Sequence, residues 1–383
     1  MDDSARIAAP ATAFILEDLG WDEAWADAFL PYDTAGRWPA RVSATHRDAW
    51  VVAAPGADDR EAVVSGRLRH EAQGPADLPA VGDWVVVAPA DGPGNGPAVI
   101  SAVLPRRSMF GRSNGDGSRR DGARTRDEQV LAANVDVAFV VTGLDGDFNL
   151  RRLERYLAVA WSGGATPVIL LNKTDLAADP AAFRVAAEAV APGVDVRPIS
   201  ALTGDGVASL VADHLAAGRT AVVLGSSGAG KSTLVNALLG RQHLRTAAVR
   251  EDDARGRHTT THRELVRLPG GALLIDTPGI RSLGVTGAAD GMDAAFADIA
   301  ELAEGCRFRD CRHDGEPGCA VTAAVADGTL DPRRFQSHRK LEREAAHHAR
   351  AADPLLRAAE RSRWKAIHAS VAIHMKSKYG DDR

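Results

Sequence analysis

The nine residues from Gly225 to Thr233 constrain the fold of this chain more than any other stretch. They follow an apolar run, Thr220 to Leu224, and precede a helical pattern, Leu234 to Leu239. A strand, a glycine-rich turn and a helix in this order are the setting of a phosphate-binding loop. Glycines let successive backbone N–H groups point at a phosphate, and the helix adds the positive end of its dipole. The full G-x-x-x-x-G-K-S spacing favours this interpretation over a glycine turn that binds nothing.

Two side chains of this loop carry specific expectations. Lys231 supplies a full positive charge for the outer phosphates, and we count it among the catalytic residues. The Ser232 hydroxyl suits a Mg²⁺ ion that keeps most of its waters. The residues expected to contact the phosphates or their magnesium are Gly225, Ser226, Ser227, Gly228, Ala229, Gly230, Lys231, Ser232 and Thr233.

A second motif indicates which base the nucleotide carries. Asn172-Lys173-Thr174-Asp175 ends an apolar strand, where an aspartate can accept hydrogen bonds from the N1–H and amino group of guanine. Adenine lacks this pair of donors and would leave the carboxylate unpaired. Ser200-Ala201 also ends an apolar strand and can place a backbone N–H near the guanine carbonyl. The expected base-binding residues are Asn172, Lys173, Thr174, Asp175, Ser200 and Ala201.

Two further motifs are expected to sense the γ-phosphate. The first, D-T-P-G, ends another apolar strand: Asp276 can hold Mg²⁺ through water, and the N–H of Gly279 can reach a γ-phosphate. The second is a loop in which His258 precedes Thr259 and Thr260, either of whose hydroxyls can complete the Mg²⁺ shell. Any one motif is weak evidence. Three of them at strand ends, together with the phosphate loop, strongly indicate a GTP site.

The order of these motifs is unusual. Ordinary Ras-like GTPases run phosphate loop, switch threonine, D-x-x-G, N-K-x-D and S-A, whereas here N-K-T-D and Ser200-Ala201 come first. This order predicts a circularly permuted α/β domain with a mainly parallel sheet, assigned to residues 127–287. Permutation keeps the site but moves the chain ends. The segment after Gly279 is therefore tethered directly to the switch that senses the γ-phosphate.

The segments before this domain predict two further units and a loop. Residues 1–36 carry apolar positions at helical spacing, which suggests a helical extension packed on the next domain. Residues 37–105 hold five short β-like runs, one of them from Ala62 to Leu68, which favour an OB-like barrel. Residues 106–126 are rich in arginine and are expected to form an exposed loop, either contacting RNA phosphate or serving as a solvated linker.

A metal-binding pattern lies in the last segment, residues 288–383, which is otherwise helical, polar and basic. Cys306, Cys311, His313 and Cys319 include every cysteine of the chain. Three thiolates and one imidazole make a closed tetrahedral set, which favours one structural zinc over iron or over unliganded cysteines. Because so polar a region has little core, the metal would hold it together.

Composition excludes some classes of protein. The net charge of −5 does not indicate a general nucleic-acid binder, so any basic surface must be local. No stretch of about 18 apolar residues suggests a membrane span. The N-terminus lacks the basic and apolar regions of a signal peptide. Three clustered cysteines fit a metal site in a reducing compartment, and we expect a cytoplasmic protein.

The motif order, the OB-like segment and the cysteine cluster together resemble the ribosome small-subunit-dependent GTPases, the RsgA (YjeQ) family. The likeness covers roughly residues 37–350. It implies a three-domain GTPase that binds GTP and GDP, is stimulated by the 30S subunit and acts in late maturation of that subunit, with the 30S subunit and its 16S rRNA as partners. We expect a monomer. The alternatives are a non-catalytic GTP-gated RNA-binding switch and an unrelated phosphate-loop ATPase, and Asp175 argues against the latter.

The residue that positions the attacking water differs from that of Ras-like enzymes. Ras-like enzymes often use a glutamine after D-x-x-G, but Ile280 stands there and cannot orient a water. The resemblance implies a histidine in the switch loop, which is His258 here. Its imidazole can accept from water or donate to a phosphate oxygen, although it could instead merely pack the loop. The expected catalytic residues are His258, Lys231, Asp276 and Gly279.

Overall fold

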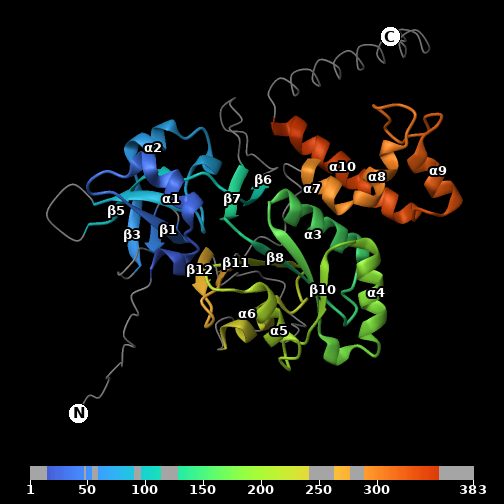
Figure 1. The fold of residues 1–383 in the computed structure, drawn as a ribbon, viewed down its shortest axis with the longest axis horizontal. Helices are drawn as coiled ribbons and strands as arrows, with labels where there is room; N and C mark the ends of the chain where they lie inside the picture. Colours follow the sequence, from blue (N-terminus) through green and yellow to red (C-terminus); the bar gives the residue numbers. More distant parts are fainter. Residues whose placement is uncertain are drawn as a thin grey trace, which may run out of the picture.

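The computed structural model describes residues 15–46, 49–53, 59–89, 96–113, 128–240, 263–276 and 289–352. Figure 1 shows three parts along the chain: a barrel near the N-terminus, a central α/β domain and a group of C-terminal helices. The barrel lies on the left of this view, and the C-terminal helices lie above the central domain on the right. This is the architecture that the sequence predicts.

Short helical elements precede the barrel and pack against it. Helix α1 begins at Asp22, whose carboxylate accepts a hydrogen bond from the backbone N–H of Trp25 and caps the first turn. Trp25 and Phe29 are buried in a cluster with Trp84 of the barrel, so the apolar face visible in the sequence is covered. These elements are η1 (Leu16–Leu19), α1 (Glu23–Phe29) and η2 (Leu30–Tyr32).

Five strands close the barrel because β1 pairs with both β2 and β4. The ladder continues from β2 through β3 and β5 back to β4; only the β3–β5 pair is parallel. Valine, alanine and isoleucine side chains from all five strands fill the interior. The strands are β1 (Trp38–Thr45), β2 (Trp50–Ala53), β3 (Arg60–Val64), β4 (Trp84–Ala88) and β5 (Ala98–Val103).

One predicted barrel strand is shorter than expected. The run from Ala62 to Leu68 was expected to be a single strand, but β3 ends at Val64 and a helix follows. The cause is Ser65, whose hydroxyl accepts a hydrogen bond from the backbone N–H of Leu68 and caps the helix. The elements after β3 are α2 (Gly66–Glu71) and η3 (Pro75–Asp77).

The described part of the arginine-rich stretch, residues 106–113, differs from the exposed loop expected. Arg106 donates to both carboxylate oxygens of buried Asp83, at 2.8 and 2.7 Å, and Arg107 makes a two-point ion pair with Asp22. These two arginines therefore stabilise the barrel and the N-terminal helices. A strand follows them and pairs antiparallel with the strand that opens the central domain. The two strands are β6 (Met109–Ser113) and β7 (Glu128–Ala133).

The central domain is built on a parallel sheet in the order β10-β9-β8-β11-β13, with β12 antiparallel at the edge beside β13. Its strands are β8 (Val137–Gly143), β9 (Thr166–Asn172), β10 (Asp195–Pro198), β11 (Thr220–Gly225), β12 (Arg263–Arg267) and β13 (Leu273–Asp276). Its helices are α3 (Leu150–Ser162), η4 (Thr174–Leu176), α4 (Pro180–Val190), α5 (Val207–His214) and α6 (Lys231–Leu239).

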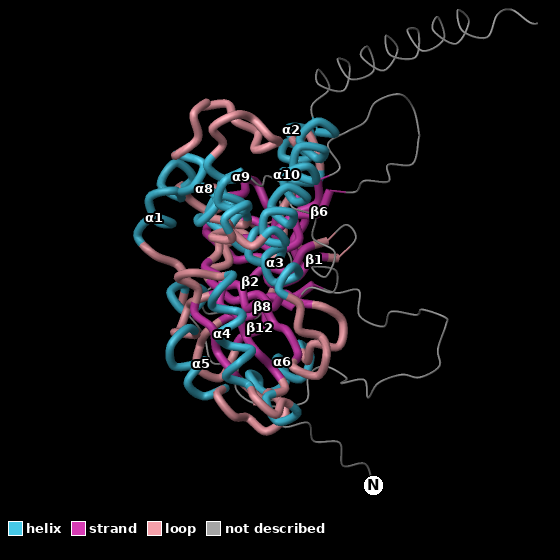
Figure 2. Tube along the Cα trace, turned by 90° about the vertical axis from the view of Figure 1, so that its right-hand side faces the viewer, coloured by secondary structure: helices cyan, strands magenta, loops and turns pink. Residues whose placement is uncertain are grey.

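Helices cover both faces of this sheet, as a parallel sheet requires. Along β8, Ala138 and Val140 belong to one apolar cluster with residues of α3 and α4. The alternate residues, Val137 and Phe139, belong to a second cluster with α5 and α6. Figure 2 shows the strands running through the middle of the molecule with helices outside them. The long apolar runs in the sequence are therefore strands buried on both sides.

The barrel and the central sheet are joined through their strands. Ala44 and Thr45 of β1 pair antiparallel with Glu264 and Arg263 of β12. This pairing makes one continuous ladder of eleven strands among the described residues. Strand β12 comes directly after the segment that carries the predicted switch threonines, Thr259 and Thr260. The barrel is therefore paired with the strand that follows this segment.

The C-terminal helices pack on α3 of the central domain. Phe296 and Ile299 are buried in the same apolar cluster as Leu153 and Leu157 of α3, so the two domains share a core. The helices are α7 (Ala289–Ala295), α8 (Ala297–Glu304), α9 (Ala320–Asp327) and α10 (Pro332–Ala352). Within the described ranges, no helix combines the length and apolar character needed to cross a membrane.

Candidate functional site

The phosphate loop connects β11 to α6, as the sequence predicts. Gly225, Gly228 and Gly230 have φ angles of 143°, 85° and 92°, a region of backbone space that favours glycine. A Cβ atom on Gly225 would lie 2.3 Å from the carbonyl oxygen of Val141 on neighbouring β8. Glycine at all three positions therefore follows from backbone conformation, and at Gly225 from close packing as well.

Lys231 opens α6 and turns back over the loop. Its ammonium donates hydrogen bonds to the backbone carbonyls of Gly225, at 2.9 Å, and Ser226. The ammonium of Lys231 therefore lies against the first two residues of the loop, Gly225 and Ser226. Ser232 and Thr233 follow in the first turn of α6, and both are partly exposed. A cation and the N-terminus of a helix thus meet at one point, which is the arrangement that binds anionic phosphate.

Asn172 ties the base-binding motif to the phosphate loop. At the end of β9, its side-chain amide donates to the carbonyl oxygen of Ala229 at 2.9 Å. Its side-chain oxygen accepts from the backbone N–H of Ala201, also at 2.9 Å. Asn172 is 1% exposed, so both bonds are shielded from water. Three segments distant in sequence are therefore brought together at one edge of the sheet.

Asp175 and Ser200 also meet, as the base-reading hypothesis requires. The Ser200 hydroxyl donates to Oδ1 of Asp175 at 2.5 Å, while Asp175 as a residue stays exposed. The backbone N–H of Thr174 bonds the carbonyl of Ile199, which fixes the two loops side by side. Lys173 has a left-handed backbone, with φ of 66°, and its ammonium pairs with Asp145. The exposed carboxylate of Asp175 is thus held in position for a base.

Asp276 lies at the same edge of the sheet. It ends β13, which runs parallel to β11 with Ile275 opposite Val222. Because the carboxyl ends of neighbouring parallel strands meet at one edge, Asp276 lies close to the start of the phosphate loop. The remaining predicted residues of the switch segments, His258, Thr259, Thr260 and Gly279, lie outside the described residues, as do most of the arginines of residues 106–126.

Two residues that the sequence motifs did not include contact the predicted nucleotide-binding loops. Asp145 and Asp147 lie in the turn after β8, and they contact Lys173 and Ser226 respectively. The signal was present: this glycine- and aspartate-rich turn follows the buried strand β8, as the base-binding and phosphate loops follow β9 and β11. It matches no named motif, so only the topology reveals it.

The four predicted metal ligands converge. The thiol sulfurs of Cys306, Cys311 and Cys319 and a ring nitrogen of His313 all lie within 4.8 Å of one another. The Cys306 and Cys319 sulfurs are 3.9 Å apart, and Nδ1 of His313 is 3.6 and 3.3 Å from them. A tetrahedral ion with Zn–S bonds of about 2.3 Å would hold two sulfurs about 3.8 Å apart. The donor set therefore has the size of a tetrahedral metal site.

Hydrogen bonds around one of these thiols, Cys319, favour its ionised form, which is the form that binds a cation. Burial acts to raise the pKa of Cys319, but hydrogen bonds from Thr322 and His313 outweigh it and lower that pKa to about 6. Cys319 caps the N-terminus of α9, where a thiolate is favoured. For Cys311, a hydrogen bond from the His313 N–H lowers the pKa, but burial and the neighbouring thiols raise it to about 11. The set is thus able to hold a metal ion once its thiols ionise.

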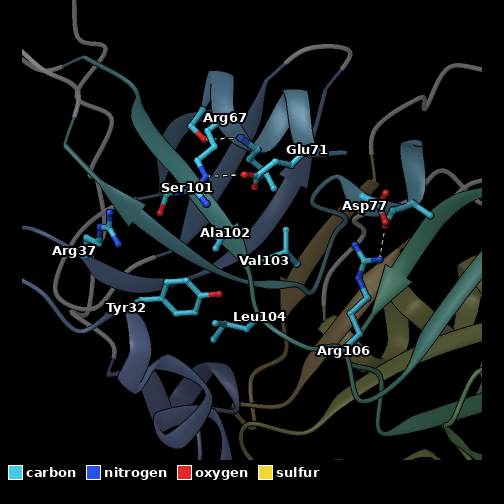
Figure 3. A pocket seen from close by; sticks show the side chains of 13 residues that line it. Tyr32, Arg37, Arg67, Glu71, Asp77, Ser101, Ala102, Val103, Leu104 and Arg106 are labelled. Atoms are coloured by element: carbon cyan, nitrogen blue, oxygen red, sulfur yellow. Dashed lines mark hydrogen bonds and ion pairs between the residues drawn. The ribbon is translucent and has the colours of Figure 1, made fainter. Parts of the chain in front are cut away.

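A cavity of about 700 Å³ opens on the barrel, away from the nucleotide motifs (Figure 3). Tyr32, Arg37 and Arg67 line it, but Arg67 is already paired with Glu71 at 2.8 Å. Arg106 also lines it and is held by Asp83 at 2.7 Å. Most of the charge in this cavity is therefore compensated within the barrel.

Comparison with known proteins leads to the same assignment. A model of the RsgA GTPase family matches residues 103–286. A small ribosomal subunit biogenesis GTPase RsgA from Opitutus terrae is 49% identical over 92% of this chain and 96% of its own length. The chain belongs to the RsgA family of GTPases. It is therefore a GTPase with a circularly permuted nucleotide domain, as its motif order predicts.

Other RsgA proteins and solved structures extend the comparison. The RsgA protein of Streptomyces coelicolor is 45% identical over 95% of this chain and 96% of its own length. The crystal structure of YjeQ from Thermotoga maritima matches with a TM-score of 0.58 at 23% identity, covering 80% of this chain and 97% of that one. YloQ, described as a circularly permuted GTPase, matches with a TM-score of 0.55 at 22% identity, covering 82% and 97%. These two structures support the three-part fold.

Proposed function

We propose that this chain binds the small (30S) ribosomal subunit, hydrolyses GTP in a manner that the subunit stimulates, and assists late maturation of the subunit. The observation that carries the nucleotide part is the buried Asn172, which joins the base-binding loop to the phosphate loop. The names of its relatives, small ribosomal subunit biogenesis GTPases, support the ribosomal part.

Each motif of the site takes one role in this proposal. The loop from Gly225 to Thr233 binds the phosphates, with Lys231 neutralising the charge that develops on the γ-phosphate. Ser232 and Asp276, the latter through water, hold Mg²⁺, and Thr259 or Thr260 completes its shell. Asp175 accepts the two donors of guanine. The N–H of Gly279 contacts the γ-phosphate and reports its presence to the helices that follow.

The metal cluster holds one structural zinc ion in this proposal. Thiolate and imidazole ligands favour zinc over harder cations, and a closed set of four protein ligands leaves no position for a substrate. Its role is to fix the turn between α8 and α9, which has little apolar core of its own. Cys306, Cys311, His313 and Cys319 are the ligands.

The ribosomal partner is bound through 16S rRNA in this proposal. The OB-like barrel, the arginine-rich residues 106–126 beyond Arg107 and the basic C-terminal segment are the RNA-facing candidates, since arginine suits phosphate. The overall charge of −5 means that binding depends on local basic surface. We propose a monomer that works in the cytoplasm, where small subunits are assembled.

Nucleotide selectivity and turnover test this proposal together. We expect tight binding of GTP and GDP, weak binding of ATP, and GTP hydrolysis that is slow alone and faster with 30S subunits. Tight GTP binding without turnover under any condition would instead identify a non-catalytic GTP-gated RNA-binding switch. Equal binding of ATP would identify a general phosphate-loop ATPase.

His258 is proposed to position the attacking water when the switch loop closes on the subunit. We expect His258→Ala to retain GTP affinity but lose most of the 30S-stimulated turnover, so that GTP-loaded protein accumulates on 30S particles. Single-turnover hydrolysis on purified particles measures this directly. Unimpaired stimulated hydrolysis would remove His258 from the reaction and leave water positioning to the ribosome.

A further inference from the structure

The turn from Gly143 to Asn149 lies between the two nucleotide-binding motifs and touches both. Asp145 pairs with the ammonium of Lys173, in the base-binding motif. Asp147 accepts a hydrogen bond at 2.5 Å from the hydroxyl of Ser226, the second residue of the phosphate loop. A single acidic turn therefore connects the base-binding and phosphate-binding parts at a second point, distinct from Asn172.

Asp147 is itself firmly held. Its Oδ1 accepts a hydrogen bond from Arg152 at 2.5 Å, and its backbone carbonyl accepts another from the same guanidinium. The backbone N–H of Gly143 approaches Oδ2 at 3.4 Å, and the Thr142 hydroxyl approaches the Asp147 carbonyl oxygen at 3.4 Å. The carboxylate thus has partners on both oxygens, and only 19% of its side chain is exposed.

The rest of the turn is fixed by helix α3. Asn149 caps α3 by accepting a hydrogen bond from the N–H of Arg152, so Arg152 sits in the first turn. A Cβ on Gly143 would lie 2.5 Å from Oδ1 of Asp145, so a larger residue there would displace that carboxylate. A rigid helix therefore supports the side chain that contacts the phosphate loop.

A carboxylate this close to a phosphate site needs a physical reason. An acidic group near bound phosphates would weaken binding by repulsion unless its charge were compensated. Here Arg152 pairs with that charge, and the Ser226 hydroxyl takes up the second oxygen. The favourable effect that remains is geometric, since a charge-assisted hydrogen bond anchors the glycine-rich loop by a side chain.

We propose that Asp147 is a positioning residue of the phosphate loop. Through Ser226 it holds the loop in the curled form in which the backbone N–H groups converge, before nucleotide arrives. The conformational entropy of these glycines is then lost when the protein folds, rather than when the nucleotide binds. This inference rests on the proposed assignment of residues 225–233 as the phosphate site.

The test compares Asp147→Ala, Asp147→Asn and Ser226→Ala with the wild-type chain, using GDP titrated against each protein. We expect the GDP Kd of Asp147→Ala to rise about tenfold, since a hydrogen bond to a charged group is lost. Asp147→Asn keeps an oxygen facing Ser226 and should recover part of the affinity. Glu188→Gln, which removes an exposed carboxylate of α4 paired only with Arg184 among the contacts described, is the matched control and should bind as wild type.

A double-mutant cycle separates positioning from general destabilisation. If Asp147 acts through Ser226, the double variant Asp147→Ala/Ser226→Ala should bind GDP no more weakly than the weaker single variant. In 30S-stimulated turnover, KM should rise more than kcat falls, because the loop binds ground state and transition state alike. Melting temperatures of all variants report any loss of fold.

The outcomes are distinct. Unchanged GDP affinity in Asp147→Ala, or effects of the two single variants that add fully, would overturn the positioning role. If Asp147→Asn lost GDP affinity and its melting temperature fell to a matching extent, the positioning role would also be overturned. Lys231→Ala is the reference for the site itself: if it binds GDP like wild type, the phosphate-loop assignment fails, whatever Asp147 does.

Discussion

At the scale of single residues, Asn172 shows why the base-binding motif needs a carboxamide. Its NH₂ group donates to Ala229 while its oxygen accepts from Ala201, and neither aspartate nor leucine could do both. Gly230 provides the space for it, since a Cβ there would lie 2.2 Å from the amide nitrogen. The glycine at position 230 of the phosphate loop is therefore explained by Asn172 of the base-binding motif.

Asp175 is the residue on which we expect base selectivity to depend. Asp175→Asn should keep the hydrogen bond from Ser200, because the amide oxygen can still accept it, but should lose the carboxylate that guanine requires. We expect GTP binding to weaken by about 1.5–3 kcal/mol. Xanthosine nucleotides, which carry a carbonyl in place of the guanine amino group, should gain relative to GTP.

Competition titrations with the two nucleotides measure this change. Their ratio matters more than either Kd, because a general loss of fold would weaken both alike. A variant that binds GTP as tightly as wild type would show that Asp175 does not read the base.

At the scale of elements, the metal cluster depends on one tight turn. His313 has a left-handed backbone, with φ of 57°, and Gly315 and Gly318 have φ angles of 101° and 80°. With the strained backbone at His313 and the two glycines that adopt positive φ freely, Nδ1 of His313 lies 3.3 Å from the Cys319 sulfur at the start of α9. Strain of this kind persists only where the surroundings hold it, and four ligands on one ion would do so.

Removal of the metal should therefore loosen the C-terminal helices while leaving nucleotide binding largely intact. We expect one zinc per chain by elemental analysis, released by a strong chelator more readily at low pH because protons compete for the thiolates. Limited proteolysis should then cut between α8 and α9. A metal-free preparation that resists cleavage in this turn as well as the wild-type chain would contradict a structural site.

Much of the element pattern follows from sequence because each strand of the central sheet is buried on both faces. Apolar runs such as Val135–Val141 and Pro167–Leu171 lie within or overlap β8 and β9, and a functional loop follows each. The barrel strands were located instead as short β-like runs, and in β2, β3 and β5 buried residues alternate with more exposed ones. Local capping was harder to foresee, since Ser65 ends β3 and starts α2 within an apolar run.

The residues that sequence misjudged are those whose partners lie far away in the chain. Arg106 looks like an exposed phosphate ligand, but Asp83 and the carbonyls of Ala76 and Leu78 surround it. Asp147 lies in an ordinary-looking turn and gains its proposed role only from Ser226, which lies 79 residues later in the chain. No local pattern reports such pairings, because the topology alone brings them together.

At the scale of the whole molecule, two buried arginines, Arg41 and Arg334, connect the barrel and the C-terminal helices to the central domain. Arg41 of the barrel donates to the carbonyl of Asn134 at 3.1 Å and to the Thr220 hydroxyl at 2.8 Å, at the start of the strand that leads to the phosphate loop. Burial lowers the pKa of Arg41 to about 10, so it stays protonated at neutral pH. The barrel is therefore fixed to the first residue of β11, the strand that ends at the phosphate loop.

Arg334 plays the corresponding part for the C-terminal helices. From α10 it donates to Glu154 of α3 at 3.1 Å, to the carbonyl of Val190, and to both oxygens of Asp298. Glu154 is fully buried, and Arg151 is its other partner among the described contacts. Helix α3 therefore contacts Arg334 in its middle and supports Asp147 at its start.

Breaking this contact should separate the domains before it affects the nucleotide site. We expect Arg334→Ala to lower the free energy of unfolding by about 3 kcal/mol, since it leaves a buried carboxylate with one partner fewer. Denaturant unfolding followed by tryptophan fluorescence measures the loss. Arg333→Ala, an exposed neighbour on the same helix, is the control. Equal stability of the two variants would mean that Arg334 does not hold the domains together.

Steady-state GTP hydrolysis with purified ribosomal particles tests the central claim most directly. The wild-type chain and Lys231→Ala are each assayed alone, with 30S subunits and with 50S subunits. We predict slow turnover by the wild type alone, a large increase with 30S subunits only, and almost none for Lys231→Ala under any condition. Wild-type turnover that 30S subunits leave unchanged, or that 50S subunits raise equally, would contradict the assignment of this chain as a GTPase of the small subunit.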